Sequence, residues 1–89
     1  MKVFAFEFIP RSERQFLSLP KKARVQIREK LEFFISTGEP FHFAKKIQGG
    51  EDLFRFRVGE YRIIFTPQSR KTIIILLILK VAHRREVYE

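Results

Sequence analysis

The 89-residue chain is long enough for one domain and too short for a second. Its 11 phenylalanines and 45% apolar residues can supply a core, which excludes an intrinsically disordered protein; the lack of cysteine excludes disulfides and thiolate metal sites. A net charge of +8 and a sequence pI of about 10.3 are typical of domains that bind nucleic acid. An acidic protein partner, an anionic membrane surface and an ordinary charged surface are the alternatives.

The N-terminal part of the sequence predicts a strand followed by a short helix. Residues 2–9 alternate apolar and polar side chains, as a half-buried strand does, and Pro10 ends that strand. Ser12 and Gln15 fit a capping box, in which two side chains satisfy the free N–H groups at a helix start. We therefore expect a helix that begins near Ser12.

A second helix is predicted from Pro20 to Ser36. Proline suits the first position of a helix, and Gly38 is a plausible residue to end it. The apolar residues recur at helical spacing, which predicts one buried stripe against a core. That stripe consists of Ala23, Ile27, Leu31 and Phe34.

The second half of the chain predicts strands. Residues 39–52 predict a loop or an irregular edge, which carries Lys45 and Lys46 before two glycines. The order β-α-α-β-β-β-β predicts an α+β domain over residues 1–89, with two N-terminal helices packed on a mostly antiparallel sheet of four to five strands. The last four strands are expected over 53–58, 61–66, 72–80 and 84–88.

The longest apolar run, IIILLIL at 73–79, predicts a buried central strand. It is too short to cross a bilayer, so we expect no membrane partner. Lys2 is followed by mixed sequence, which does not predict a secretory leader.

The stretch FRFRVGEYR, residues 54–62, predicts a hairpin with one basic face. Its two-residue turn, Gly-Glu, suits type II′ and pairs Arg57 with Arg62, with Arg55 beside them. The apolar residues of both strands then face the helices. Facing like charges destabilise a sheet by about 0.2–1 kcal/mol. Such a face is either a charge-guarded surface or an anion site, for which arginine provides a planar fork of donors.

The C-terminal residues VAHRREVYE can place further side chains with catalytic potential on that face. In a strand over 84–88, Arg84 and Tyr88 face outward, whereas Arg85 and Val87 face inward. RNA cleavage by a ribose 2′-OH needs a proton acceptor, a proton donor to the leaving 5′-oxygen, and cations that stabilise the transition state. Tyr88 can accept a proton only where arginines lower its pKa from about 10.

The chain has 2 histidines. His42 lies between two phenylalanines and is interpreted as structural, whereas His83 fits a polar rim residue and an RNA contact equally well. The sequence contains no pattern for a metal-ligand cluster, a glycine-rich phosphate loop or a Ser/His/Asp triad. Without further information these residues favour a phosphate-binding surface over an enzyme.

The run LFRFRVGEYRIIF followed by LKVAHRREVY resembles the RelE branch of the RelE/ParE superfamily, the toxins of type II toxin–antitoxin modules. The resemblance extends from Phe4 to Tyr88 and includes the segment AKKIQGG. RelE-like toxins cleave mRNA in the ribosomal A site without a metal ion, and an antitoxin that wraps the toxin silences them. The resemblance therefore implies a cytoplasmic endoribonuclease, an mRNA interferase, that needs no metal or small-molecule cofactor. Its partners would be a cognate antitoxin, the ribosome and mRNA.

The resemblance also implies roles for individual residues. Arg62 would stabilise the transition state, Arg84 would act as general acid and Tyr88 as general base. Strand parity favours Arg84 over Arg85 as the catalytic arginine. The residues that would contact RNA are Arg55, Arg57, Lys45, Lys46, His83 and Arg85.

Two other functions are compatible with the same fold. A ParE-like toxin inhibits gyrase and cleaves nothing, but that branch usually lacks the arginine and tyrosine set. A non-catalytic RNA-binding protein would use the basic face alone. For the antitoxin, Phe33, Phe41 or Phe43 are candidate anchors if exposed, and otherwise they complete the core.

Overall fold

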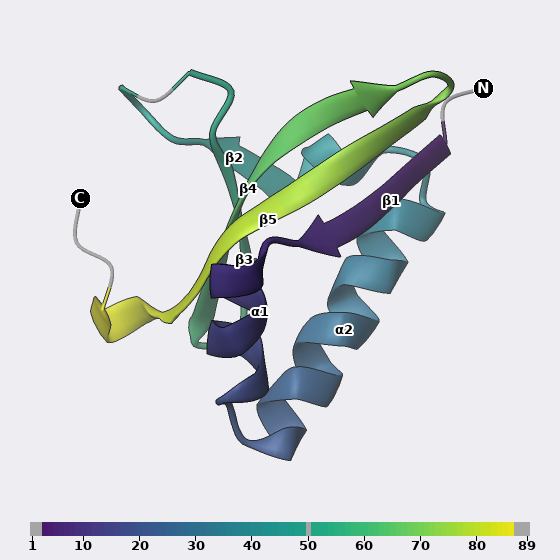
Figure 1. The fold of residues 1–89 in the computed structure, drawn as a ribbon. Coiled ribbons are helices and arrows are strands. Elements are labelled where there is room, and N and C mark those ends of the chain that lie inside the picture. Colours follow the sequence, from purple (N-terminus) through teal and green to yellow (C-terminus); the bar gives the residue numbers. More distant parts are fainter. Residues whose placement is uncertain (1–2, 50, 87–89) are drawn as a thin grey trace.

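Figure 1 shows the architecture in a computed structural model, which describes residues 3–49 and 51–86. Two helices pack on a five-stranded sheet, which confirms the predicted α+β class. The elements are β1 (Val3–Phe8), α1 (Pro10–Leu17), α2 (Lys21–Ser36), the 3₁₀ turn η1 (Pro40–Phe43), β2 (Ala44–Lys46), β3 (Phe54–Val58), β4 (Tyr61–Arg70), β5 (Ile73–His83) and the 3₁₀ turn η2 (Arg84–Glu86).

The sheet has the order β1-β5-β4-β3-β2, so the apolar strand β5 lies in its interior, as predicted. β1 runs parallel to β5, and the other neighbouring strands are antiparallel. On the face away from the core, Arg70 of β4 forms an ion pair with Glu7 of β1 at 3.3 Å. Because β5 lies between these strands, the ion pair ties three strands together on that face.

Helix α1 borders β5 beyond the point where β1 ends. It begins at Pro10, and Ser12 lies inside it, where the buried hydroxyl donates to the Ile78 carbonyl oxygen at 2.6 Å. Gln15 Oε1 accepts from the Val81 N–H at 2.9 Å. The predicted capping box is therefore wrong. Pro10 already begins the helix, and the two polar side chains satisfy main-chain groups of β5 instead.

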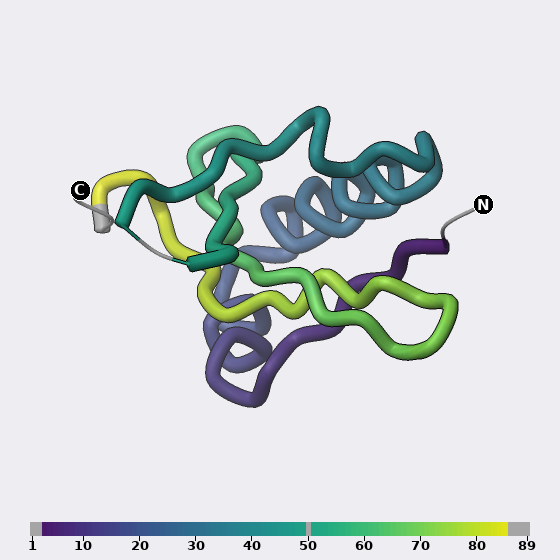
Figure 2. Tube along the Cα trace, turned by 90° about the horizontal axis from the view of Figure 1, so that it is seen from above, coloured from purple at the N-terminus to yellow at the C-terminus, as the bar shows by residue number. Residues whose placement is uncertain are grey.

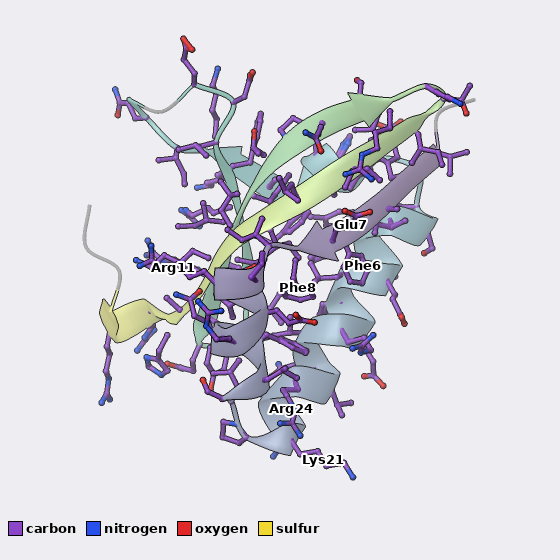
Figure 3. All side chains as sticks on the ribbon, in the orientation of Figure 1. Phe6, Glu7, Phe8, Arg11, Lys21 and Arg24 are labelled. Carbon is purple, nitrogen blue, oxygen red and sulfur yellow. The ribbon has the colours of Figure 1, made fainter. Side chains whose placement is uncertain are left out.

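The core lies between the helices and one face of the sheet. Phe6 and Phe8 of β1 point toward α2, whereas Glu7 points to the opposite face (Figure 3). The Phe56 ring stacks on Phe65 with centroids 4.4 Å apart. The predicted stripe of α2 is buried as expected, although Pro20 precedes this helix rather than beginning it: Ala23, Ile27, Leu31 and Phe34.

One predicted strand is wrong, and one short edge strand was not predicted as a strand. The predicted strand over 84–88 is absent from residues 84–86, which form η2, and residues 87 and 88 lie outside the described residues. β5 continues to His83 because β4 still pairs with it there; the Arg84 N–H then donates to the Glu60 carbonyl oxygen at 2.7 Å and the chain leaves the sheet. The fifth strand is instead β2, within the region predicted as a loop or irregular edge, where it pairs with β3.

Candidate functional site

The β3–β4 hairpin has the predicted register. Val58 pairs with Tyr61, and Arg57 pairs with Arg62. Gly59 has a φ of +57°, whereas Glu60 is not among the residues with positive φ, as a type II′ turn requires. The apolar residues of both strands contact the core, so the arginines are held on the opposite face.

This opposite face carries two pairs of facing basic residues. Arg57 lies opposite Arg62, and Lys45 of β2 lies opposite Arg55 of β3. A position two residues away along a strand faces the same side, so both pairs are on the face that the helices leave uncovered. Facing like charges cost about 0.2–1 kcal/mol per pair, a cost that a bound anion would remove.

A cleft of about 490 Å³, called here the basic cleft, opens beside these pairs. Arg55 and Arg62 line it together with residues 46–49, which begin at the last residue of β2. Two guanidinium groups and an ammonium group around one cleft suit a phosphate, because each guanidinium can donate two parallel hydrogen bonds. Arg55 also borders a smaller hollow of about 170 Å³, whose other lining residues are Phe43, Lys45 and Arg57.

The C-terminal turn η2 meets the hairpin at its turn. Arg84 Nε lies 3.1 Å from Glu60 Oε1, and His83 Nε2 lies 3.7 Å from the same oxygen. Arg84 and Arg85 are both exposed. Because residues 84–86 are not a strand, strand parity no longer distinguishes Arg84 from Arg85 as the catalytic arginine.

Figure 1 and Figure 2 both show η2 and the segment after β2 at the same side of the molecule, away from α2. The described residues thus bring five predicted RNA contacts and catalytic groups to the two hollows: Lys45, Lys46, Arg55, Arg57 and Arg62. Arg84 and His83 lie at the hairpin turn, and Tyr88 is outside the described residues. The expected convergence of Tyr88 on this face stays a prediction.

Two features of the site were not predicted. Residues 47–49 line the basic cleft, although the sequence of this loop gave only its flanking lysines as candidates. Glu60 contacts both Arg84 and His83, and its place in a two-residue turn is the only signal that the sequence offers for it. The spacing of residues in the sequence predicts neither feature, because each brings together separate segments of the chain.

The other candidate residues lie elsewhere. His42 is exposed in η1 and lies 3.5 Å from a Glu39 carboxylate oxygen. Of the candidate antitoxin anchors, Phe41 packs against the core, whereas Phe33 and Phe43 are 51% and 42% exposed, with ring centroids 5.7 Å apart. Phe33 and Phe43 are thus the pair accessible to a partner.

The described ranges, 3–49 and 51–86, contain neither a metal-binding cluster nor a membrane-spanning helix. Within them, no three histidine or acidic side chains are grouped so that they can hold a metal ion. No helix in the same ranges combines the length and the apolar character needed to cross a bilayer.

Comparisons with known proteins identify the family. Residues 7–88 match the sequence model of the family described as ParE toxin of type II toxin-antitoxin system, parDE. No protein with a curated description matches the chain. The fold is similar to several solved structures of RelE toxins in complex with their antitoxins.

One such structure is the RelB-RelE antitoxin-toxin complex from Methanococcus jannaschii, with 25% identity over 91% of this chain and 93% of that chain and a TM-score of 0.65. The archaeal RelE-RelB complex from Pyrococcus horikoshii has 25% identity, 96% and 99% coverage and a TM-score of 0.69. The RelBE2 complex from Mycobacterium tuberculosis has 23% identity, 92% and 99% coverage and a TM-score of 0.71, and supports the fold alone. The chain therefore belongs to the ParE toxin family and is a type II toxin of the RelE/ParE superfamily.

Proposed function

We propose that residues 1–89 form a single toxin domain that acts as a ribosome-dependent mRNA endoribonuclease, an mRNA interferase. The observation that carries this proposal is the basic cleft, in which Arg55 and Arg62 face a space of about 490 Å³ on a face that no helix covers. Because its substrate would be mRNA in the ribosomal A site, the protein would act in the cytoplasm. The reaction would require no metal or small-molecule cofactor.

The proposed reaction is attack by a ribose 2′-OH on the adjacent phosphorus. The bond from the 2′-oxygen to phosphorus forms, and the bond from phosphorus to the 5′-oxygen breaks. Tyr88 would take the proton of the 2′-OH, and Arg84 would deliver a proton to the leaving 5′-oxygen. Arg62 would stabilise the negative charge that develops on the phosphate oxygens.

The remaining basic residues would bind RNA. Arg55 and Arg57 would hold the reacting phosphate, since Arg57 lies directly opposite Arg62 and Arg55 lines the basic cleft together with Arg62. The neighbouring positive charges would also favour the phenolate form of Tyr88. Four residues would contact the RNA strand on either side of that phosphate: Lys45, Lys46, His83 and Arg85.

An antitoxin is the second proposed partner, because the toxins of similar structure were solved as antitoxin complexes. The anchors that we propose for it are Phe33 and Phe43, which are exposed neighbours. Phe33 also borders a groove of about 280 Å³ along α2, which would receive an amphipathic helix.

The alternative is a gyrase-inhibiting toxin without nuclease activity. The match to the ParE family description favours this alternative. It gives no role to the facing basic pairs on β2, β3 and β4, and for that reason the nuclease is preferred.

The test is mRNA cleavage on purified, programmed ribosomes. Wild-type protein should cleave in the A site, and Arg62→Ala should lower the rate by about 10²–10³-fold, as loss of one transition-state donor does. Arg84→Ala and Tyr88→Phe should lower it by about 10²–10⁴-fold, the usual contribution of a general acid or base. Lys21→Ala, at the start of α2 (Figure 3), removes one charge far from the cleft and should cleave like wild type.

Two results would contradict these assignments. Wild-type protein that cleaves nothing would rule out the nuclease, and full activity in all three site variants would rule out the assigned residues. Growth arrest with intact mRNA and inhibited gyrase would establish the alternative.

A further inference from the structure

We propose that Glu60, the second residue of the β3–β4 turn, is a positioning residue that orients Arg84 and His83 at the end of the hairpin that carries the facing pair Arg57 and Arg62. This inference rests on the proposed endoribonuclease function. It assigns a role to an acidic side chain at the edge of a basic face, where its charge opposes the binding of an anion.

Glu60 holds the C-terminal segment by its main chain and by its side chain. The Arg84 N–H donates to the Glu60 carbonyl oxygen at 2.7 Å, which fixes the point where the chain leaves β5. Glu60 Oε1 lies 3.1 Å from Arg84 Nε, an ion pair that favours one direction of the arginine side chain. The main-chain bond sets where the arginine side chain begins, and the ion pair favours one orientation of its guanidinium.

The ion pair leaves the reactive end of Arg84 accessible. Nε is the donor nearest the aliphatic stem, so the contact does not use the two terminal nitrogens, which carry four of the five guanidinium donors. The Arg84 side chain is 63% exposed, so a substrate phosphate can reach those nitrogens. A carboxylate in this position orients the planar group without occupying its fork.

His83 contacts Arg85, Glu60 and Tyr61. Its Nδ1 accepts from the Arg85 N–H at 3.2 Å, so the neutral ring carries its hydrogen on Nε2, which faces the Glu60 carboxylate 3.7 Å away. Its ring also meets Tyr61 edge-on, with centroids 5.5 Å apart. Glu60 therefore contributes to the orientation of the His83 ring, together with Arg85 and Tyr61.

This network contributes little to stability, because ion pairs between exposed side chains are weak in water. Its measurable effect should be on the reaction. Loss of the Glu60 carboxylate removes a negative charge at the end of the basic hairpin, which favours RNA binding, and releases Arg84, which slows the proton transfer. Opposite effects on binding and on rate distinguish positioning from a general loss of folded protein.

The experiment compares Glu60→Ala and Glu60→Gln with wild type in cleavage on programmed ribosomes. Glu60→Ala should lower the rate at saturation by about 10- to 100-fold, the scale of a misplaced catalytic group, while the half-saturating ribosome concentration stays equal or falls. Glu60→Gln, which keeps an acceptor oxygen at the same reach, should recover part of that rate. Glu32→Ala on α2 makes the same charge change away from the site and should leave both values unchanged.

A double-mutant cycle shows whether Glu60 acts through Arg84. In protein that already carries Arg84→Ala, adding Glu60→Ala should cause much less than its full loss, because the group that it orients is gone. Thermal unfolding of each variant verifies that all of them are folded. Wild-type rates in Glu60→Ala, or fully additive losses in the double variant, would overturn the inference.

A second readout does not depend on cleavage. In nitrogen-15-labelled protein, the Arg84 Nε–H should give a signal that is protected from solvent exchange, and Glu60→Ala should remove that protection. Unchanged protection in Glu60→Ala would overturn the positioning role. A wild-type protein that cleaves nothing would instead overturn the proposed function, while this signal would still show whether Glu60 holds Arg84.

Discussion

The β3–β4 hairpin and the C-terminal turn η2 both present arginines, but different forces hold them. Arg57 and Arg62 belong to paired strands whose other face is an aromatic core, so burial fixes their positions. Arg84 follows the last strand, and an exposed carboxylate at the hairpin turn holds its side chain. A side chain on a packed strand keeps its position when one surface residue is replaced, whereas a side chain held by one exposed ion pair does not. Substitutions in the core beneath the hairpin should therefore lower the free energy of unfolding. Substitutions in η2 should lower the cleavage rate and leave the free energy of unfolding unchanged.

The largest effect is expected from Phe56→Ala. Phe56 is 1% exposed and lies between Phe34 and Phe65, with ring centroids 4.7 and 4.4 Å away. Its truncation should lower the free energy of unfolding by about 3–5 kcal/mol, as measured by urea denaturation. Arg84→Ala should leave the unfolding curve nearly unchanged. Equal losses of unfolding free energy from both substitutions would show that the two regions are held by the same forces.

Arg62→Lys separates charge from geometry at the hairpin. Lysine keeps the positive charge but lacks the planar fork, so the cleavage rate should fall by about 10²–10³-fold without a change in fold. Arg28→Lys on the exposed side of α2 is the matched control and should cleave normally. A rate near that of wild type would show that charge alone is sufficient at this position.

Gln15→Ala tests the support of the strand that leads to η2. Gln15 Oε1 accepts from the Val81 N–H at 2.9 Å, close to the end of β5. Loss of this bond should cost about 1 kcal/mol, which corresponds to a fall of about 4–8 °C in the melting temperature. The Val81 amide should also exchange faster with solvent. Unchanged exchange would mean that α1 does not protect this edge.

The smallest effect is expected from Arg57→Ala on RNA binding. Each phosphate contact with a single strand contributes about 0.7 to the slope of log affinity against log salt. Arg57→Ala should reduce that slope by about this amount for a short single-stranded RNA. Lys21→Ala, which removes one charge from α2, should leave the slope unchanged. Equal slopes for both variants would show that Arg57 does not contact RNA.

The hairpin register was predictable because its causes are local. A two-residue turn with glycine in its first position determines which residues pair, and the alternation of apolar and basic residues determines which face is buried. The central position of β5 was predictable for a similar reason, since its residues are apolar on both faces.

The elements that were predicted wrongly depend on distant contacts. The C-terminal strand was expected from alternation, but the Arg84 N–H bonds to Glu60 and turns the chain away from the sheet. β2 is only three residues long and forms because β3 lies beside it. Ser12 donates to a carbonyl oxygen of β5 instead of accepting from a free N–H group at the helix start. In each case the decisive partner belongs to another part of the chain.

We expect the basic cleft to promote attack by the 2′-OH of mRNA in the ribosome. The chemical ends of the mRNA fragments from programmed ribosomes test it most directly. Attack by the 2′-OH should leave a 2′,3′-cyclic phosphate on the upstream fragment and a 5′-hydroxyl on the downstream fragment, with both products lost in Arg62→Ala. Fragments with 3′-hydroxyl and 5′-phosphate ends, or mRNA that stays intact with wild-type protein, would contradict it.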